Sequence, residues 1–226
     1  AYGFSNLNDL RRIKELITSI NNSSTYTNPL VIAGAGPTGV ELACKLADLV
    51  DNRVEICLVD KGKKILSQSK SFNRDKAIEA IAKRNINVYL EHYIESIDDD
   101  FIEISTFESE RNNSLKINYS GFIWTAGLRP FRLKFLDHLL NENRKIKVNQ
   151  FLQIKKSENI FFVGDIVFCE NCPFPSSAQV AMQQGFLTAQ NIIFLRKRNK
   201  LQPFKFEDLG EMLSLGIDNA SIRAYG

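Results

Sequence analysis

The sequence predicts an α/β fold built on a doubly wound, parallel sheet, and three features indicate it. An apolar run at 29–33 leads into a glycine-rich segment at 34–39. Apolar residues at helical spacing follow that segment, and residues 53–60 then have the composition of a second buried strand. Strand, glycine turn, helix and strand in this order form a βαβ unit, whose two strands are parallel.

Further elements surround this unit. Apolar residues recur at helical spacing within 1–20 and predict an amphipathic helix, which the polar segment 21–25 ends. A polar helix is expected at about 71–84, and residues 87–90 resemble a third strand. These elements extend the βαβ unit on both sides.

After the third strand the pattern changes to short β-rich pieces. Residues 101–104 and 115–117 are joined by a polar turn at 108–114, which predicts a β-meander. Residues 122–124 form a short buried strand that leads into Thr-Ala-Gly. The meander and this strand complete the first half of the chain.

The second half is organised differently. Residues 145–148 and 152–154 suggest a hairpin, and the run 159–163 suggests a fully buried strand that ends at a Gly-Asp pair. A long helix is expected at about 176–198, opened by a proline and two serine cap candidates.

The glycine-rich segment has the spacing Gly-x-Gly-x-x-Gly, with Gly34, Gly36 and Gly39 at the three positions. After a strand and before a helix, the first glycine allows a tight turn, the second admits a pyrophosphate, and the third lets the helix pack on the strand. The helix N-terminus then directs N–H groups at the anion. The motif predicts a Rossmann-like dinucleotide-binding domain.

Asp60 ends the second predicted strand, 26 positions after Gly34. An acid there accepts hydrogen bonds from the adenosine ribose and repels a 2′-phosphate, which favours NADH over NADPH. Lys61, Lys63 and Lys64 follow and could compensate a phosphate. The alternative is that Asp60 only ends a strand.

Composition narrows the class of protein. The 226 residues suffice for one large or two small domains, and 44% apolar and 24% charged residues are ordinary for a soluble protein. A net charge of +3 does not indicate nucleic acid as a partner. No apolar run reaches the length of a membrane span, and the first residues lack the pattern of a signal peptide, so a reducing, intracellular setting fits.

The chain has four cysteines, too few for a disulfide framework. Cys44 and Cys57 fall in a predicted helix and strand, where a thiol is usually packed and inert. Cys169 and Cys172 form a C-x-x-C, which is compatible with a redox pair or half a metal site. No second C-x-x-C accompanies them, so a metal site is not expected, and the pair lies in a predicted loop rather than at a helix N-terminus.

Five segments together resemble the type II NADH:quinone oxidoreductases, also called alternative NADH dehydrogenases, and most of all their cyanobacterial and plastid branch. Other flavoprotein reductases share the first three, whereas the alanine–glutamine segment distinguishes the quinone reductases. The segments are 34–43 (GAGPTGVELA), 124–127 (WTAG), 160–165 (IFFVGD), 178–184 (AQVAMQQ) and 208–216 (DLGEMLSLG).

The resemblance implies a domain division. Residues 1–25 would be a connecting amphipathic helix, 26–128 the NADH-binding domain, and 129–226 the C-terminal part of an FAD-binding domain with a quinone-site helix. The family's first glycine motif, for FAD, and its membrane-binding C-terminal helices have no counterpart in these residues. The chain is therefore expected to be an internal part of such an enzyme.

The resemblance also implies cofactors and partners. NADH would pass hydride to FAD, and the reduced flavin would pass two electrons to a membrane quinone. The intact protein would bind peripherally to a bioenergetic membrane on its cytoplasmic or stromal side, with a homodimer left open.

Site roles follow from the same resemblance. Glu41 would lie beside the nicotinamide–flavin contact, and Gly127 would let the backbone approach NADH. Gly164 and Asp165 would hold the flavin, with the carboxylate on a ribityl hydroxyl. Gln179 and Gln183, four apart and hence on one helix face, would border the flavin ring and the quinone.

Two alternatives remain open from the sequence. One is a soluble disulfide or ferredoxin reductase, for which Cys169 and Cys172 would matter. The other is an NADH-binding module without catalysis, because one of the two dinucleotide motifs is missing.

Overall fold

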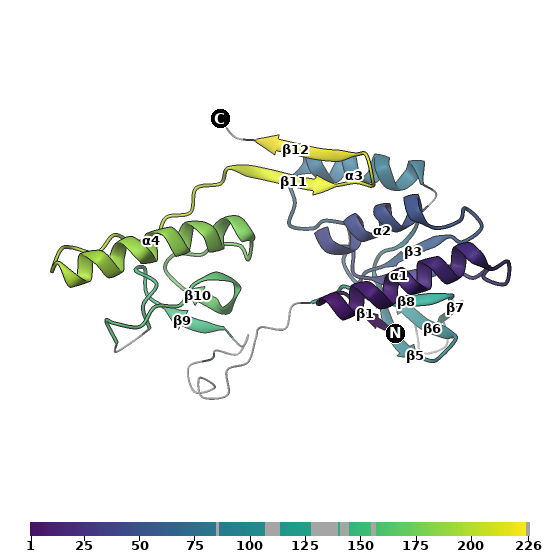
Figure 1. The fold of residues 1–226 in the computed structure, drawn as a ribbon, viewed down its shortest axis with the longest axis horizontal. Helices are drawn as coiled ribbons and strands as arrows, with labels where there is room; N and C mark the ends of the chain where they lie inside the picture. Colours follow the sequence, from purple (N-terminus) through teal and green to yellow (C-terminus); the bar gives the residue numbers. More distant parts are fainter. Residues whose placement is uncertain (85, 107–113, 128–139, 141–144, 155–156, 225–226) are drawn as a thin grey trace. The chain divides into compact units, whose positions relative to one another are not determined.

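The computed structural model describes the chain except residues 85, 107–113, 128–139, 141–144, 155–156 and 225–226. Its described residues belong to two compact units. The first unit contains Ala1–Gly127 and Gly210–Ala224, and the second is drawn from residues 128–209 (Figure 1). Each unit has its own hydrophobic core.

A five-stranded parallel sheet forms the centre of the first unit. Its order is β1 (Tyr2–Gly3), β8 (Gly121–Trp124), β2 (Leu30–Ala33), β3 (Ile56–Val59) and β4 (Ile86–Tyr89). Every residue of β2 and β3 is buried, as expected for central strands of a parallel sheet. The predicted Rossmann-like fold is confirmed, and the two-residue strand β1 is an addition that no sequence pattern indicated.

Three helices pack on one face of this sheet: α1 (Leu7–Asn22), α2 (Pro37–Leu49) and α3 (Ser71–Lys83). The Asn6 side chain caps α1 by accepting hydrogen bonds from two backbone N–H groups of the first turn. The apolar positions predicted for the first helix include its buried stripe, formed by Ile13, Leu16 and Ile20.

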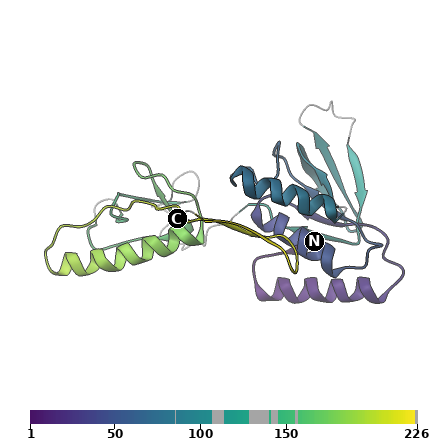
Figure 2. The same cartoon turned by 90° about the horizontal axis from the view of Figure 1, so that it is seen from above.

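A three-stranded antiparallel sheet, β5 (His92–Ile97), β6 (Phe101–Thr106) and β7 (Leu115–Asn118), packs on the other face. Figure 2 shows it on the side opposite α1. Ile102 and Ile104 share a core there with the parallel strands. The expected meander is confirmed, while nearly all of the polar turn expected at 108–114 lies outside the described residues.

The hairpin of β11 (Gly210–Ser214) and β12 (Ala220–Ala224) belongs to the first unit. Asn73 of α3 is fully buried and donates to the Glu211 carboxylate over 2.9 Å, and it accepts from Ser221 over 2.6 Å. The sequence analysis grouped these residues with 129–226, whereas the structure packs them against α2 and α3.

The second unit contains β9 (Ile146–Val148) and β10 (Val167–Cys169), which pair in parallel, the short 3₁₀ helix η2 (Gly164–Ile166), and α4 (Ala178–Arg196). The predicted long helix is confirmed. Val148 and Ile154 form the antiparallel bridge of the expected hairpin.

The expectation of a fully buried strand at 159–163 is wrong for this structure. Phe161 bridges to Gln153 on one side, but Ile160 and Val163 are 46% and 37% exposed. Within the described residues, no strand pairs with the other edge of the run 159–163. An apolar run becomes a central strand only when a second neighbour covers it.

Candidate functional site

The glycine turn lies where β2 ends, between the ends of β3 and β8. Gly34 has a φ of +109° and continues the sheet by donating to Val59 over 2.8 Å. Gly36 precedes the first residue of α2, and a Cβ added there would have no neighbour within 4 Å. The turn is therefore open at the position where a pyrophosphate is expected to approach.

Gly39 allows α2 to approach β2 closely. A Cβ on Gly39 would lie only 1.8 Å from the Gly34 carbonyl oxygen, so no side chain fits. Pro37 occupies the first helical turn, where its missing N–H costs nothing. This close approach directs the N-terminus of α2 toward the end of β2, which is the geometry of a helix that binds phosphate.

Asp60 lies directly after β3 and holds the glycine turn. One carboxylate oxygen accepts from the Ala35 N–H over 2.7 Å, and the other accepts from the Gly62 N–H over 2.6 Å. Asp60 thus does more than end a strand, because its side chain links the turn after β2 to the loop after β3. Each oxygen keeps a second lone pair for a ligand hydroxyl.

The turn after β8 lies beside the glycine turn. Thr125 donates from its hydroxyl to the Ala33 carbonyl over 2.7 Å, which ties this turn to the end of β2. Gly127 has a φ of +78°, and nothing lies within 4 Å of the position of its Cβ. The backbone at Gly127 is therefore accessible, as an approach by a ligand requires.

Glu41 lies in α2, two residues after Gly39, and is half-buried. Its carboxylate accepts from the backbone N–H of Ser214 in β11 over 2.8 Å. The returning hairpin therefore fixes the orientation of Glu41, although 173 residues separate the two partners.

In the second unit, Gly164 and Asp165 form the turn of η2. Gly164 has a φ of +80°, and its N–H donates to the Gln184 side chain over 2.7 Å. Asp165 is exposed. Gln184 is fully buried, and it anchors the turn to α4, a role that the sequence analysis did not assign.

Gln179 and Gln183 point to one side of α4, as their spacing predicted, and hold the chain that returns along the helix. Gln183 makes two hydrogen bonds with the backbone of Glu207, at 2.7 and 3.0 Å, and Gln179 accepts from the Leu209 N–H over 3.0 Å. Asn191 makes the same paired contact with the Gln202 backbone, both at 2.9 Å.

The sequence analysis did not predict this amide clamp, formed by Gln179, Gln183 and Asn191. A repeated pairing between side-chain amides and a distant backbone has no local signature. The i, i+4 spacing of Gln179 and Gln183 was a partial signal, because it puts both amides on one helix face.

Cys169 and Cys172 form a disulfide with a Cα–Cα distance of 5.2 Å. Cys44 and Cys57 are buried free thiols, and burial raises the pKa of each to about 11. Within the described residues, no group of three His, Cys, Asp or Glu side chains is placed to bind a metal. Nor does that part of the chain contain a helix that could cross a membrane.

This is a dinucleotide-binding α/β protein, as shown by the parallel sheet, the open glycine turn and the Asp60 carboxylate bonded to two backbone N–H groups. Comparison with known protein families assigns it to one of them. The chain belongs to the pyridine nucleotide-disulphide oxidoreductase family, whose model matches residues 2–185.

Curated relatives are quinone reductases by name. The chain is 31% identical to demethylphylloquinone reductase NdbB of Synechocystis over 99% of its own length and 55% of that protein. It is 26% identical to the alternative NAD(P)H-ubiquinone oxidoreductase C1 of Arabidopsis thaliana, and 27% identical to the type II NADH:quinone oxidoreductase of Staphylococcus aureus. The chain spans about half the length of these relatives.

Among solved structures, the NDH2 of Plasmodium falciparum in complex with NADH superimposes with a TM-score of 0.86. The match covers the whole of this chain and 65% of that one, at 18% identity. This likeness shows that the fold is shared.

Proposed function

We propose that this chain is the NADH-binding domain and one part of the FAD-binding domain of an NADH:quinone oxidoreductase. The open glycine turn at the N-terminus of α2, with Asp60 beside it, is the observation that carries the proposal. The names of the curated relatives supply the electron acceptor, a quinone. We assign residues 26–128 to the NADH domain and 129–226 mainly to the FAD domain.

NADH fits the first unit. Gly36 leaves space for the pyrophosphate, Gly34 and Gly39 shape the turn, and the α2 N–H groups stabilise its charge. The free lone pairs of Asp60 accept ribose hydroxyls and oppose a 2′-phosphate. Gly127 lies in the turn after β8, which Thr125 ties to the end of β2.

Glu41 is the carboxylate nearest the helix start, and we place it beside the nicotinamide. The Ser214 N–H fixes its rotamer before a ligand arrives, which avoids an ordering cost on binding. An anion in the first turns of α2 is also stabilised by the helix dipole.

FAD fits the second unit at Gly164 and Asp165. The turn is rigidly attached to α4 through Gln184, while the carboxylate of Asp165 is exposed and can accept a ribityl hydroxyl. Bound FAD would supply the two-electron chemistry between nicotinamide and quinone. The run 160–163, exposed at Ile160 and Val163, is then the edge on which further polypeptide of the FAD domain would pair.

The quinone is assigned to α4. Met182 and Phe186 are 76% and 70% exposed, one turn apart, and present an apolar surface beside Gln179 and Gln183. The amides can donate to a quinone oxygen without introducing a charge. A lipid-soluble acceptor places the intact protein peripherally on a bioenergetic membrane, on its cytoplasmic or stromal face.

The test is turnover by the whole protein loaded with FAD. We expect NADH-driven reduction of a short-chain quinone, with negligible reduction of a disulfide or of ferredoxin. Good activity with either of the last two and none with any quinone would reject the proposal. Bleaching of bound flavin by NADH under nitrogen reports the first half-reaction separately.

A further inference from the structure

The disulfide lies between the two parts of the candidate flavin site. Cys169 ends β10, four residues after Asp165, and Cys172 lies five residues before Ser177, the N-cap of α4. The connector from the Asp165 turn to the helix with Gln179 and Gln183 therefore passes through the disulfide loop.

Both ends of this connector are anchored independently of the disulfide. At one end Gly164 donates to Gln184, and β10 pairs with β9 as far as Cys169. At the other end the Ser177 hydroxyl accepts from the Val180 N–H over 3.2 Å. Opening the disulfide would release the segment between these anchors without removing them.

The loop is accessible from solvent. Cys172 is half-buried, and Glu170 and Asn171 are exposed. The Lys147 ammonium pairs with the Glu170 carboxylate, which lowers the pKa of that carboxyl group and tethers the loop to β9. Cys169 is buried in the core of the second unit, and Cys172 packs against that core but is only half-buried, so an external thiol can reach the disulfide from the Cys172 side.

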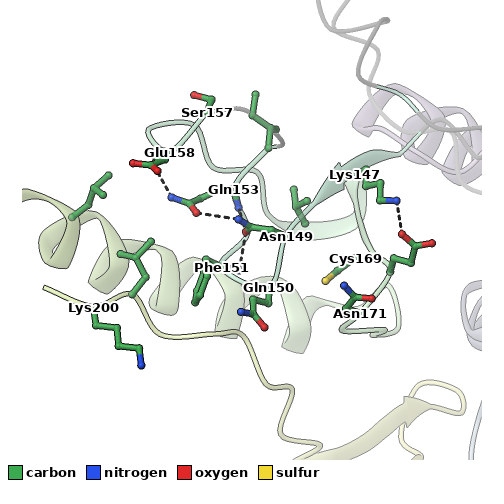
Figure 3. A pocket seen from close by; sticks show the side chains of 15 residues that line it. Lys147, Asn149, Gln150, Phe151, Gln153, Ser157, Glu158, Cys169, Asn171 and Lys200 are labelled. Carbon is green, nitrogen blue, oxygen red and sulfur yellow. Dashed lines mark hydrogen bonds and ion pairs between the residues drawn. The ribbon is translucent and has the colours of Figure 1, made fainter. Parts of the chain in front are cut away.

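The loop also forms one wall of the large cavity in Figure 3, with a volume of about 1340 Å³. The facing walls carry polar side chains, among them Lys147, Asn149 and Gln153, and apolar ones, among them Val148, Phe151 and Ile154. Small-molecule pockets are about 300–1,000 Å³. This cavity is larger than that, so it has room for a polypeptide segment that carries the reacting thiols.

We propose that Cys169–Cys172 is a reversible thiol–disulfide exchange site for a dithiol protein that docks on the exposed loop residues Glu170 and Asn171 at the edge of this cavity. One thiolate of that protein attacks the Sγ of Cys172, the less buried residue of the pair, and the Cys169 sulfur leaves and is protonated. The second thiol of the partner then attacks the mixed disulfide and releases the Cys172 thiol. The partner becomes a disulfide, so two electrons and two protons are transferred.

The chain contains its own internal control. Cys44 and Cys57 are buried, and their raised pKa values of about 11 leave almost no thiolate at neutral pH. Alkylation of the folded protein with iodoacetamide therefore reports on the Cys169–Cys172 pair and not on Cys44 or Cys57, as long as the protein stays folded. Cys169 is 3% exposed in the disulfide form, so its alkylation reports that the loop has opened.

The experiment uses the whole protein, purified without reductant. We expect no alkylated cysteine at first, and alkylation of Cys169 and Cys172 alone after dithiothreitol, by peptide mass spectrometry. Oxidised dithiothreitol should restore the disulfide. Hydrogen exchange of the amides at 166–176 should rise at least about 5-fold on reduction, with α4 unchanged.

If the disulfide is reduced only in denaturant, and all four cysteines are then alkylated together, the proposal is overturned and the disulfide is a structural crosslink. Failure of oxidised dithiothreitol to re-form the Cys169–Cys172 disulfide would also overturn the proposal. The double variant Cys169→Ser/Cys172→Ser should show the fast exchange at 166–176 without any reductant, whereas Cys57→Ser should retain the redox response. Docking is tested with a thioredoxin-type protein, which should reduce the pair at least 10-fold faster than an equal concentration of glutathione.

FAD affinity is a second measurement of the effect of reducing the disulfide, and it rests on the proposed function. Because the loop adjoins Asp165, reduction should weaken FAD binding by about 3-fold to 10-fold. An unchanged FAD affinity together with normal thiol exchange would reject the link to the flavin and leave the exchange site intact. Absence of FAD binding in both redox states would count against the proposed function alone.

Discussion

Replacing Gly39 with alanine would place a methyl carbon 1.8 Å from the Gly34 carbonyl oxygen. The clash is with backbone, so relief requires α2 or the glycine turn to move by roughly 1 Å or more. Forcing extra volume into a packed site costs about 1–3 kcal/mol, and a backbone clash lies at the upper end. Alanine gains about 1 kcal/mol of helix propensity over glycine. The net expectation is a loss of about 2 kcal/mol.

Two matched substitutions separate packing from binding. Gly185 lies in α4 with open space around its Cβ position, so Gly185→Ala should stabilise by up to about 1 kcal/mol. Gly36 has equally open space but faces the expected pyrophosphate, so Gly36→Ala should cost no more than about 1 kcal/mol of stability as a helix cap. It should nevertheless weaken NADH binding at least about 10-fold, a loss of about 1.4 kcal/mol.

Urea unfolding and NADH titration by fluorescence measure the two effects. A Gly39→Ala variant as stable as Gly185→Ala would refute the packing argument. A Gly36→Ala variant that binds NADH as tightly as the unmodified chain would refute the position of the pyrophosphate.

Asp60→Asn should lower NADH affinity and reduce the preference for NADH over NADPH in parallel titrations. The amide would turn its N–H₂ toward the N–H of Ala35 or Gly62, which now donates to a carboxylate oxygen. An unchanged preference would contradict the ribose assignment. Asp48→Asn should cost about 1 kcal/mol at pH 7. The hydrogen bond from Arg84 lowers the Asp48 pKa in the folded state, so this contribution is present above about pH 4 and disappears as the pH falls further. A stability difference that persists at pH 2 would exclude that origin. Gln183→Leu should lower the free energy of unfolding by about 1 kcal/mol, because it removes two hydrogen bonds to Glu207. It should also raise the KM for quinone but not the KM for NADH. Equal changes in both KM values would indicate that the amide is purely structural.

The sequence was sufficient to predict the central βαβ unit, the helices and the meander of the first unit because their signals are local. Glycines spaced for one turn type and a four-residue apolar strand such as β2 encode their own conformation. The helical repeat of α1 does the same. Each of these patterns reports which face of an element is buried, and the parallel sheet follows from connecting them.

Other features depend on distant residues and have no local signal. The two residues of β1 become a strand only because β8 lies beside them. The run 159–163 has the composition of a central strand, yet its exposure depends on which chain pairs with its second edge. The count of cysteines argued against a disulfide framework, and it could not show that Cys169 and Cys172 are bonded to each other.

Side-chain amides show why candidate site residues are the hardest to predict. Gln179 and Gln183 were selected for their place in a family motif, and the structure uses both to hold the returning chain. These uses are compatible, because a primary amide has two donors and two acceptor lone pairs, and the contacts described for Gln183 use one of each. An amide fixed by the backbone also keeps its remaining N–H in one direction. The clamp can therefore preorganise the donor that a quinone oxygen would meet.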